Sequence, residues 1–294
     1  MQKLHLGAAQ CALDLGDGSE RAEYVNQDYI LHKLGRPHRA IGIMYTYYPH
    51  DKQWPQRISK ACKDMNITFQ WDYPYDDYFP FNADGQPWEQ MRDIRRHGQD
   101  AALTLTLDCS LSDDELREIA RMLRPYGRMT IRINHECGGT WFTHNKRFTY
   151  EQVGKFFAHF SDIIHQEAPN VRTVFCAGFA QADGKLEKED EFAVAYRAAD
   201  VWSADCYLAL HYGWPYDVAE VGGGQYKADS VGMYYDMFRR TYERASSQFG
   251  AKPLVTAEFN TDGDVTGPRH QGESVIRFAE AFRDHKADWF KAIS

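Results

Sequence analysis

The chain has 294 residues, 43% of them apolar, and its 34 basic and 42 acidic residues give a formal charge of −8 at pH 7. An acidic chain without a run of basic residues is not typical of proteins that bind nucleic acid or an anionic membrane surface, so we expect neither partner. The length allows two domains, although a single α/β barrel of about 250 residues or more is common.

The amino-terminal segment and the cysteines bear on localisation and redox state. The segment has no apolar signal core, and no apolar stretch approaches the roughly 20 residues of a transmembrane helix. We expect either a cytoplasmic protein or a secreted one whose signal has been removed.

No Cys-x-x-Cys pair occurs, so structural zinc is not expected, and we interpret the cysteines as buried thiols whose disulfide state is open. They are Cys11, Cys62, Cys109, Cys137, Cys176 and Cys206.

Short β-rich segments alternate with amphipathic helical segments along the chain. The predicted strands are Leu4–Ala8, Ala40–Thr46, Ile67–Asp72, Ala101–Leu107, Arg128–His135, Val171–Ala177, Asp200–Tyr207, Pro253–Phe259 and Trp289–Ser294. Repeated βα units predict an α/β fold with a parallel sheet. We expect one (β/α)8 TIM barrel that forms a single catalytic domain over residues 1–294, with extended βα loops.

Nine predicted strands exceed the eight positions of such a barrel. We interpret Ala101–Leu107 as the extra strand, because it lies in the long excursion between strands three and four. The predicted eighth strand, Trp289–Ser294, ends the chain without the loop and helix that normally follow it. We therefore expect either a truncated carboxyl terminus or another segment that covers the gap. No linker rich in Pro, Gly or Ser divides the chain.

Capping and periodicity signals mark the predicted helices. A helix over residues 19–34 starts at Ser19 and ends at Gly35. Capping boxes, in which Ser or Thr precedes Glu or Gln by three residues, open two further helices. The boxes begin at Ser112, with a helix to about Leu123, and at Thr149. Apolar stripes with helical spacing are Val153, Phe156, Phe157, Phe160, Ile163 and Ile164, then Val231, Tyr234, Tyr235, Phe238 and Tyr242.

Polar residues at the carboxyl ends of the strands are the candidate site residues, since the active site of a βα barrel forms there. In strand four, one parity carries Thr130, Arg132, Asn134 and Glu136, and we expect this row to face the barrel interior. Glu258 ends the corresponding row of strand seven. Strand six carries a third polar row, which consists of Ser203, Asp205 and Tyr207.

Two glutamates at the mouth of one barrel suit glycoside hydrolysis. One carboxyl group protonates the leaving oxygen while the other, ionised, attacks the anomeric carbon, and a retaining enzyme holds the two about 5–5.5 Å apart. Aromatic rings in the loops at the same strand ends would stack on sugar faces. These rings are Tyr45, Tyr47, Tyr48, Trp54, Trp71, Tyr73, Tyr75, Tyr78, Phe79, Phe81, Trp141, Phe142, Tyr207, Tyr212, Trp214 and Tyr216.

Several segments resemble one family of sugar-cleaving enzymes. Residues 132–142 read Arg-Ile-Asn-His-Glu-Cys-Gly-Gly-Thr-Trp-Phe and resemble the acid/base motif of glycoside hydrolase family 26, in the (β/α)8 clan A of retaining glycosidases. That motif runs Arg, two residues, His-Glu, Met-Asn-Gly, one residue, then Trp and an aromatic residue. Residues 253–259 resemble the nucleophile strand of the family, residues 202–207 its sixth strand, and residues 71–74 a Trp-Glu-Pro segment of its third strand.

The resemblance implies a retaining, endo-acting hydrolase of a β-linked polysaccharide that uses neither cofactor nor metal. Glu136 would be the acid/base and Glu258 the nucleophile, with Tyr207 bonded to Glu258 and Arg132 supporting its charge. His135 would line the reacting-sugar site and Trp141 would stack on sugar. Together with other residues near the strand ends, the expected substrate-binding residues are His135, Arg132, Trp141, Tyr207, Trp71, His144, Trp214 and Asp205.

Two departures from the family motif leave the substrate open. Cys137-Gly138 stands where Met-Asn is usual, and His144 stands where a tryptophan is usual. Both positions are expected near the reacting sugar, so mannan, β-1,3-xylan, mixed-linkage glucan and another β-linked glycan all remain candidates. The alternatives to a glycosidase are a carbohydrate-binding barrel without activity and a metal-dependent barrel hydrolase using Glu136, Asp205, Glu258 and nearby histidines. The metal alternative is disfavoured because the first strand has no His-x-His pair.

Overall fold

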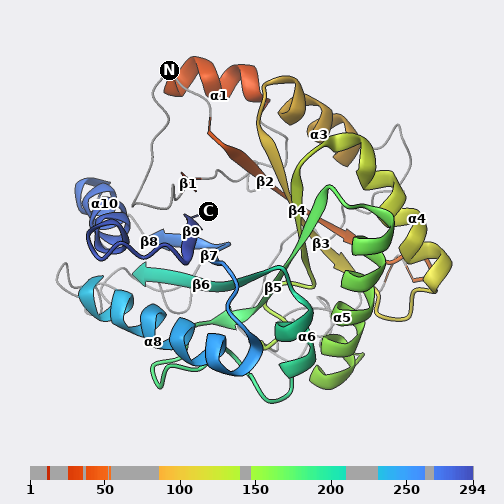
Figure 1. Cartoon of the computed structure of the whole chain (residues 1–294). Coiled ribbons are helices and arrows are strands. Elements are labelled where there is room, and N and C mark those ends of the chain that lie inside the picture. Colours follow the sequence, from red (N-terminus) through yellow and green to blue (C-terminus); the bar gives the residue numbers. More distant parts are fainter. Residues whose placement is uncertain are drawn as a thin grey trace. The chain divides into compact units, whose positions relative to one another are not determined.

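The computed structural model describes residues 12–13, 26–35, 38–51, 53, 86–139, 147–209, 231–261 and 268–293. These residues form two compact units. The first contains the described residues of Asp14–Ala177 and Glu189–Val201, and the second contains those of Gln2–Leu13, Gly178–Lys188 and Trp202–Ser294. Strands alternate with helices in both units, and the strand pairs described within each unit are parallel (Figure 1). The predicted α/β class is therefore confirmed, while a closed eight-stranded barrel stays a prediction.

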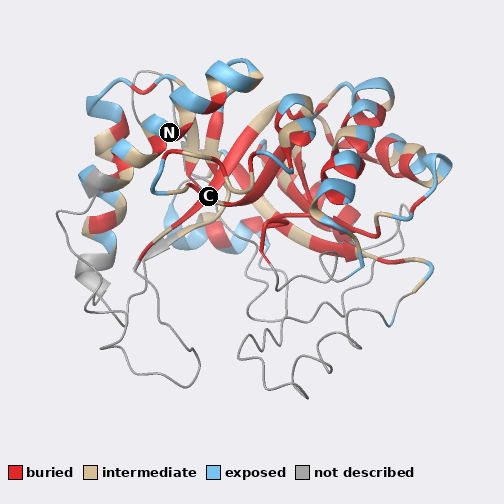
Figure 2. Ribbon diagram, turned by 90° about the horizontal axis from the view of Figure 1, so that it is seen from below, coloured by how far each residue is buried: buried red, intermediate tan, exposed pale blue. Residues whose placement is uncertain are grey.

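The first unit is built on neighbouring parallel strands in the order β2-β3-β4-β5. Their bounds are β2 Ala40–Tyr47, β3 Asp100–Leu107, β4 Met129–Ile133 and β5 Val171–Phe179. All eight residues of β2 pair in register with β3, from Ala40 opposite Asp100 to Tyr47 opposite Leu107. Most side chains on both faces of these strands are buried, as the red colour of the strands in Figure 2 shows. Burial on both faces is the expected pattern for a parallel sheet covered by helices.

The interpretation of Ala101–Leu107 as an extra strand was wrong. This segment belongs to β3, which pairs with β2 on one side and with β4 on the other. The segment is suited to an interior strand because both faces of β3 are buried. Leu103 and Leu105 are buried on one face, and Thr104 and Thr106 are buried on the other. A strand buried on both faces occupies an interior place in a sheet. The predicted strand Ile67–Asp72 lies outside the described residues.

The helices of the first unit begin largely where their capping signals predict. They are α1 Gln27–Leu34, α3 Gln86–Arg96, α4 Asp113–Leu123, the 3-10 helix η2 Arg124–Tyr126, α5 Tyr150–Glu167 and α6 Ala193–Ala198. Ser112 caps α4 and Thr149 caps α5, each through a complete capping box, as predicted. Helix α1 ends at Gly35 as predicted but begins after Asn26, whose side chain accepts a hydrogen bond from the Tyr29 amide, and not at Ser19. Helix α3 was not predicted, because its residues lie in the long segment that the sequence analysis placed between strands three and four.

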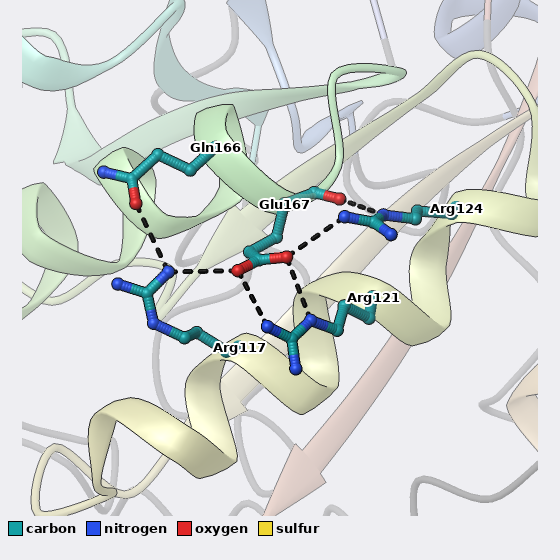
Figure 3. Close-up of polar contacts among 5 residues, drawn as sticks. All are labelled: Arg117, Arg121, Arg124, Gln166 and Glu167. Atoms are coloured by element: carbon teal, nitrogen blue, oxygen red, sulfur yellow. Dashed lines mark hydrogen bonds and ion pairs between the residues drawn. The ribbon is translucent and has the colours of Figure 1, made fainter.

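Helices α4 and α5 are joined at their carboxyl ends by an ion-pair cluster around Glu167 (Figure 3). The Glu167 carboxylate accepts hydrogen bonds from Arg117 at 3.0 Å, from Arg121 at 2.9 and 3.0 Å, and from Arg124 at 3.0 Å. Arg124 also donates to the Glu167 backbone carbonyl. The three arginines project from α4 and η2 toward the last residue of α5, so the cluster fixes the two helices against each other.

The second unit contains the strand order β1-β9-β7-β6, with β8 paired to β6 as well. Its elements are β1 Ala12–Leu13, β6 Val201–Ala209, α8 Val231–Phe249, β7 Leu254–Thr256, β8 Phe259–Thr261, α10 Pro268–Asp284 and β9 Phe290–Ile293. The predicted last strand is confirmed as β9, which pairs with β1 and β7. The predicted strand Pro253–Phe259 is not continuous, because the chain bends at residues 257–258 between β7 and β8.

Aromatic side chains form much of the core in each unit. In the first unit, the apolar stripe of α5 packs on β5, with the Phe157 and Phe175 rings 4.6 Å apart. In the second unit, the Phe282 and Phe290 rings stack at 3.9 Å, and Tyr242 of α8 stacks on Trp289 at 4.6 Å. The stripe of α5 is therefore a core face, and Tyr235 and Phe238 are buried members of the stripe of α8.

The described cysteines are free thiols. Cys137, Cys176 and Cys206 are buried and Cys109 is partly exposed, whereas Cys11 and Cys62 lie outside the described residues. Burial raises the pKa of the Cys109 and Cys206 thiols above the ordinary value, which leaves them protonated and unreactive at neutral pH.

Among the helices that the structure describes, none has the length and apolar character needed to cross a membrane.

Candidate active site

Arg132, His135 and Glu136 lie at the carboxyl end of β4 in the first unit. Strand β4 ends at Ile133, so Arg132 belongs to the strand and the other two follow it in a turn. All three side chains are buried, with 7% or less of each residue exposed. Buried charged groups need polar partners, and the neighbouring strand β3 supplies some of them. The Arg132 guanidinium donates through Nε to the Thr104 hydroxyl at 2.9 Å.

His135 is held in its neutral form by this environment. Complete burial lowers the pKa of the His135 imidazole well below its ordinary value, and the positive charge of Arg132 lowers it further. The Nδ1 atom of His135 lies 3.5 Å from the Thr106 hydroxyl. A neutral imidazole can donate through one ring nitrogen and accept through the other.

The chain leaves β4 after Ile133, so Asn134 and Glu136 lie in a turn and not in the strand, which was predicted to extend to His135. Asn134 and Glu136 have φ angles of 47° and 48°, in the left-handed region that residues other than glycine rarely adopt. The Glu136 carbonyl accepts a hydrogen bond from the Gly139 amide at 3.0 Å, and the Gly138 amide donates to the Ala177 carbonyl at 2.7 Å. The orientation of Glu136 is therefore set by this turn and not by strand alternation.

Glu258 lies in the second unit, at the bend between β7 and β8, where side chains of β6 bind the backbone. The Ser203 hydroxyl accepts a hydrogen bond from the Ala257 amide at 3.0 Å, and Asp205 Oδ1 accepts one from the Glu258 amide at 3.1 Å. The Glu258 carbonyl in turn accepts from the Cys206 amide at 3.0 Å. Both sides of the Glu258 backbone are thereby fixed to β6.

Tyr207 binds the side chain of Glu258. Its phenol donates to Glu258 Oε2 at 2.7 Å, so the hydrogen bond that the family resemblance implies is present. The Phe179 ring lies against the Tyr207 ring at a centroid distance of 6.0 Å. Of the polar row predicted on β6, Tyr207 contacts the Glu258 side chain, whereas Ser203 and Asp205 contact its bend. Asp205, predicted to bind substrate, thus has a backbone partner in Glu258.

Some of the predicted sugar-contacting rings are core residues. Tyr45 and Tyr48, at the end of β2, are 5% and 0% exposed and belong to the core, whereas Tyr47 between them is partly exposed. The predicted substrate-binding residues Trp71, Trp141, His144 and Trp214 lie outside the described residues.

The sequence reasoning missed two charged residues near the end of β3. Asp108 follows β3 directly and is almost fully buried, and its carboxylate pairs with Arg147 at 2.8 Å. Asp108 also accepts hydrogen bonds from the amide and hydroxyl groups of Ser110. An acidic residue directly after a strand could have identified Asp108 as a candidate. It was not considered because the strand before it was interpreted as an extra strand outside the barrel.

The comparison with protein-family models finds no match, and neither does the comparison with curated proteins. Solved structures do resemble the chain. The β-mannanase of glycoside hydrolase family 26 from Bacteroides ovatus superposes with a TM-score of 0.55 at 9% identity, covering 97% of this chain and 80% of that protein. A family 39 glycoside hydrolase from Bacteroides cellulosilyticus WH2 gives 0.53 at 9% identity, covering 96% and 55%.

A third similar structure is the exo-β-1,4-mannosidase from Opitutaceae bacterium strain TAV5, with a TM-score of 0.53 at 11% identity. The match covers the whole of this chain and 54% of that enzyme. This chain therefore spans about half the length of the second and third of these proteins. At such low identities the likeness shows a shared fold, and these structural neighbours are glycoside hydrolases.

Proposed function

We propose that the protein is a retaining glycoside hydrolase that cleaves a β-linked polysaccharide, with Glu258 as nucleophile and Glu136 as acid/base. The observation that carries the proposal is the 2.7 Å hydrogen bond from Tyr207 to the Glu258 carboxylate, on a backbone that Asp205 holds. A nucleophilic carboxylate needs one oxygen directed at the anomeric carbon, and a donor on the other oxygen favours that orientation. The fold shared with glycoside hydrolases supports the same function.

In the proposed first step, a Glu258 oxygen attacks the anomeric carbon while the carboxylic acid of Glu136 gives its proton to the leaving glycosidic oxygen. The glycosidic bond breaks and a covalent glycosyl ester of Glu258 forms. In the second step Glu136, now a carboxylate, removes a proton from water, whose oxygen attacks the same carbon and releases Glu258. The mechanism requires both carboxyl groups to face one sugar.

His135 and Tyr207 are the described neighbours on which the proposed roles of the two glutamates draw. Glu136 follows His135 in the turn after β4, and burial together with Arg132 lowers the pKa of that imidazole. The Tyr207 phenol donates a hydrogen bond to Oε2 of Glu258 and so helps to orient the carboxylate. Arg132, His135 and Tyr207 are proposed to line the reacting-sugar site, together with Trp71, Trp141, His144 and Trp214. The candidate substrates are mannan, β-1,3-xylan, mixed-linkage glucan and related β-linked glycans.

Covalent trapping tests the proposal directly. The protein would be incubated with 2-deoxy-2-fluoro glycosides that carry a dinitrophenolate leaving group, and the labelled peptide would be located by mass spectrometry. We expect a label on Glu258, loss of turnover in Glu258→Ala, and products that retain the β configuration by proton NMR. A label elsewhere with an active Glu258→Ala variant, or full oligosaccharide binding without turnover on a panel of the candidate glycans, would contradict it. The latter result would favour a carbohydrate-binding barrel.

A further inference from the structure

The side chain of Asn134 connects the turn that carries Glu136 to the end of β3. Its Oδ1 atom accepts a hydrogen bond from the Leu107 amide at 2.6 Å, and its Nδ2 atom donates to Cys109 Sγ at 3.3 Å. The Asn134 backbone amide donates to the Leu105 carbonyl at 3.1 Å. One nearly fully buried residue therefore binds three residues of the β3 end.

The backbone at this point has a conformation that needs support. Asn134 adopts the left-handed region with φ 47°, which asparagine tolerates better than most residues. Glu136 adopts it with φ 48°, and a left-handed conformation costs a residue with a β-carbon roughly 1–2 kcal/mol. Such a conformation persists only where neighbouring contacts hold it, and the Asn134 side chain supplies contacts two residues before Glu136.

We propose that Asn134 is a positioning residue, which holds the strained turn so that the Glu136 carboxyl group stays aimed at the glycosidic oxygen. This inference rests on the proposed role of Glu136 as acid/base. Asn134 acts through the backbone and takes no part in proton transfer. If its two side-chain hydrogen bonds are lost, the turn can relax toward ordinary φ values and redirect Glu136, while the strands below it remain paired.

Substrates whose leaving groups differ in their need for a proton distinguish a positioning role of Asn134 from a purely structural role. A phenyl glycoside has a poor leaving group and depends on proton donation, whereas a 2,4-dinitrophenyl glycoside departs without it. General acid catalysis contributes roughly 100- to 10,000-fold to rate. Because kcat/KM reports the first, glycosylating step, a misplaced acid lowers kcat/KM for the phenyl substrate selectively. A loss of folded protein lowers both values by the same factor.

The test compares kcat/KM for both leaving groups on β-mannobiosides, β-1,3-xylobiosides and β-cellobiosides. Asn134→Gly keeps the left-handed backbone accessible but removes both side-chain hydrogen bonds, and we expect kcat/KM to fall at least about 10-fold more for phenyl than for dinitrophenyl glycosides. Cys109→Ala removes only the partner of Nδ2 and should shift the ratio in the same direction by a smaller factor. If Asn134→Gly does not fold, the ratio of the two kcat/KM values in Cys109→Ala tests the positioning role of Asn134.

Asn170 offers a matched control at the other end of β4. Its Nδ2 atom donates to the carbonyls of Leu123 and Gly127 at 3.2 and 2.6 Å, so it also connects loops across the strands. Asn170→Gly should lower stability and leave the ratio of the two kcat/KM values unchanged. Equal losses on both substrates in Asn134→Gly and Cys109→Ala, with an active wild-type protein, would overturn the positioning role alone. Absence of turnover by the wild-type protein would overturn the proposed function and this inference with it.

Discussion

The phenol of Tyr207 donates a 2.7 Å hydrogen bond to Oε2 of Glu258, while the backbone amide next to Tyr207, that of Cys206, donates to the Glu258 carbonyl. Strand β6 therefore binds both the side chain and the main chain of the proposed nucleophile. Such double attachment limits the rotation of the carboxylate. Reactions between groups held in this way avoid much of the entropic cost of orientation.

Tyr207→Phe should lower kcat/KM by roughly 10- to 100-fold. The substitution keeps the ring that packs against Phe179 but removes the donor, and a hydrogen bond to a charged group contributes about 1.5–3 kcal/mol. Steady-state kinetics on the polysaccharide identified by screening would measure the change. Tyr242→Phe is the control, because the Tyr242 ring belongs to α8 and stacks on Trp289, and the variant should keep full activity. Equal kinetics for Tyr207→Phe and wild type would contradict the role given to the phenol.

Asp205→Ala should reduce both stability and activity. It leaves the part-buried Glu258 amide without its carboxylate acceptor, and about 1–3 kcal/mol, the cost of a fully buried unsatisfied amide, is an upper bound for the loss in the free energy of unfolding. Ser203→Ala is the matched variant, since it removes the acceptor of the adjacent Ala257 amide. We expect similar losses of stability in urea unfolding but a larger loss of kcat in Asp205→Ala. If both variants lose kcat equally, the bond at Glu258 has no special importance.

Local signals in the sequence predicted much of the fold. The capping boxes at Ser112 and Thr149 involve residues only three apart, so the sequence contains all the information that positions those helix starts. The apolar stripe of α5 likewise predicted which face of the helix is buried. The place of β3 was not predictable in this way, because strand order depends on pairing between residues about 60 positions apart, such as Ala40 and Asp100.

The candidate site shows the same division between local and non-local information. The motif around His135 and Glu136 supplied two of the candidate residues, and the hydrogen bond between Tyr207 and Glu258 is present as the resemblance implies. Strand alternation failed at Asn134, because the chain leaves β4 one residue earlier and turns through left-handed angles. The partners that stabilise this turn, Leu107 and Cys109, come from a neighbouring strand end that no local pattern connects to it.

His135 should make the protein less stable in mild acid. Its folded-state pKa lies well below the ordinary 6.5, first because of burial and second because of Arg132. Above pH 7 the imidazole is neutral in both states and contributes no pH dependence. Below about pH 6.5 the unfolded chain binds a proton that the folded protein does not, so the free energy of unfolding falls by up to about 1.4 kcal/mol per pH unit. His135→Gln removes this loss.

Urea unfolding of the wild-type protein and of His135→Gln from pH 8 to pH 5 would measure the effect. The difference between their free energies of unfolding should be constant above pH 7 and should change in favour of the variant as the pH decreases below about 6.5. All other titrating groups are shared, so they cancel in this difference. Parallel stability curves down to pH 5 would show that the imidazole is not held neutral.

Glu167→Gln should destabilise the protein by removing the charge at the centre of the cluster between α4 and α5 (Figure 3). Hydrogen bonding to Arg121 is the largest effect that lowers the pKa of Glu167, to about 2, with Arg117 adding to it. Because this pKa is lowered, the stabilisation is complete above about pH 4.5 and is lost as the pH falls toward 2. We expect a Tm lowered by a few degrees at pH 7, and a difference from wild type that shrinks below pH 4.5.

Glu151→Gln separates the cluster from the general effect of removing a surface carboxylate. Glu151 pairs with Lys155 four residues along the same helix, so it joins no two elements, and pairs of this kind contribute little. Differential scanning calorimetry should show a smaller change in Tm for Glu151→Gln than for Glu167→Gln. The difference should also narrow at about 1 M salt, where screening acts over about 3 Å. Equal Tm values for the two variants would show that the arginines around Glu167 do not couple α4 to α5.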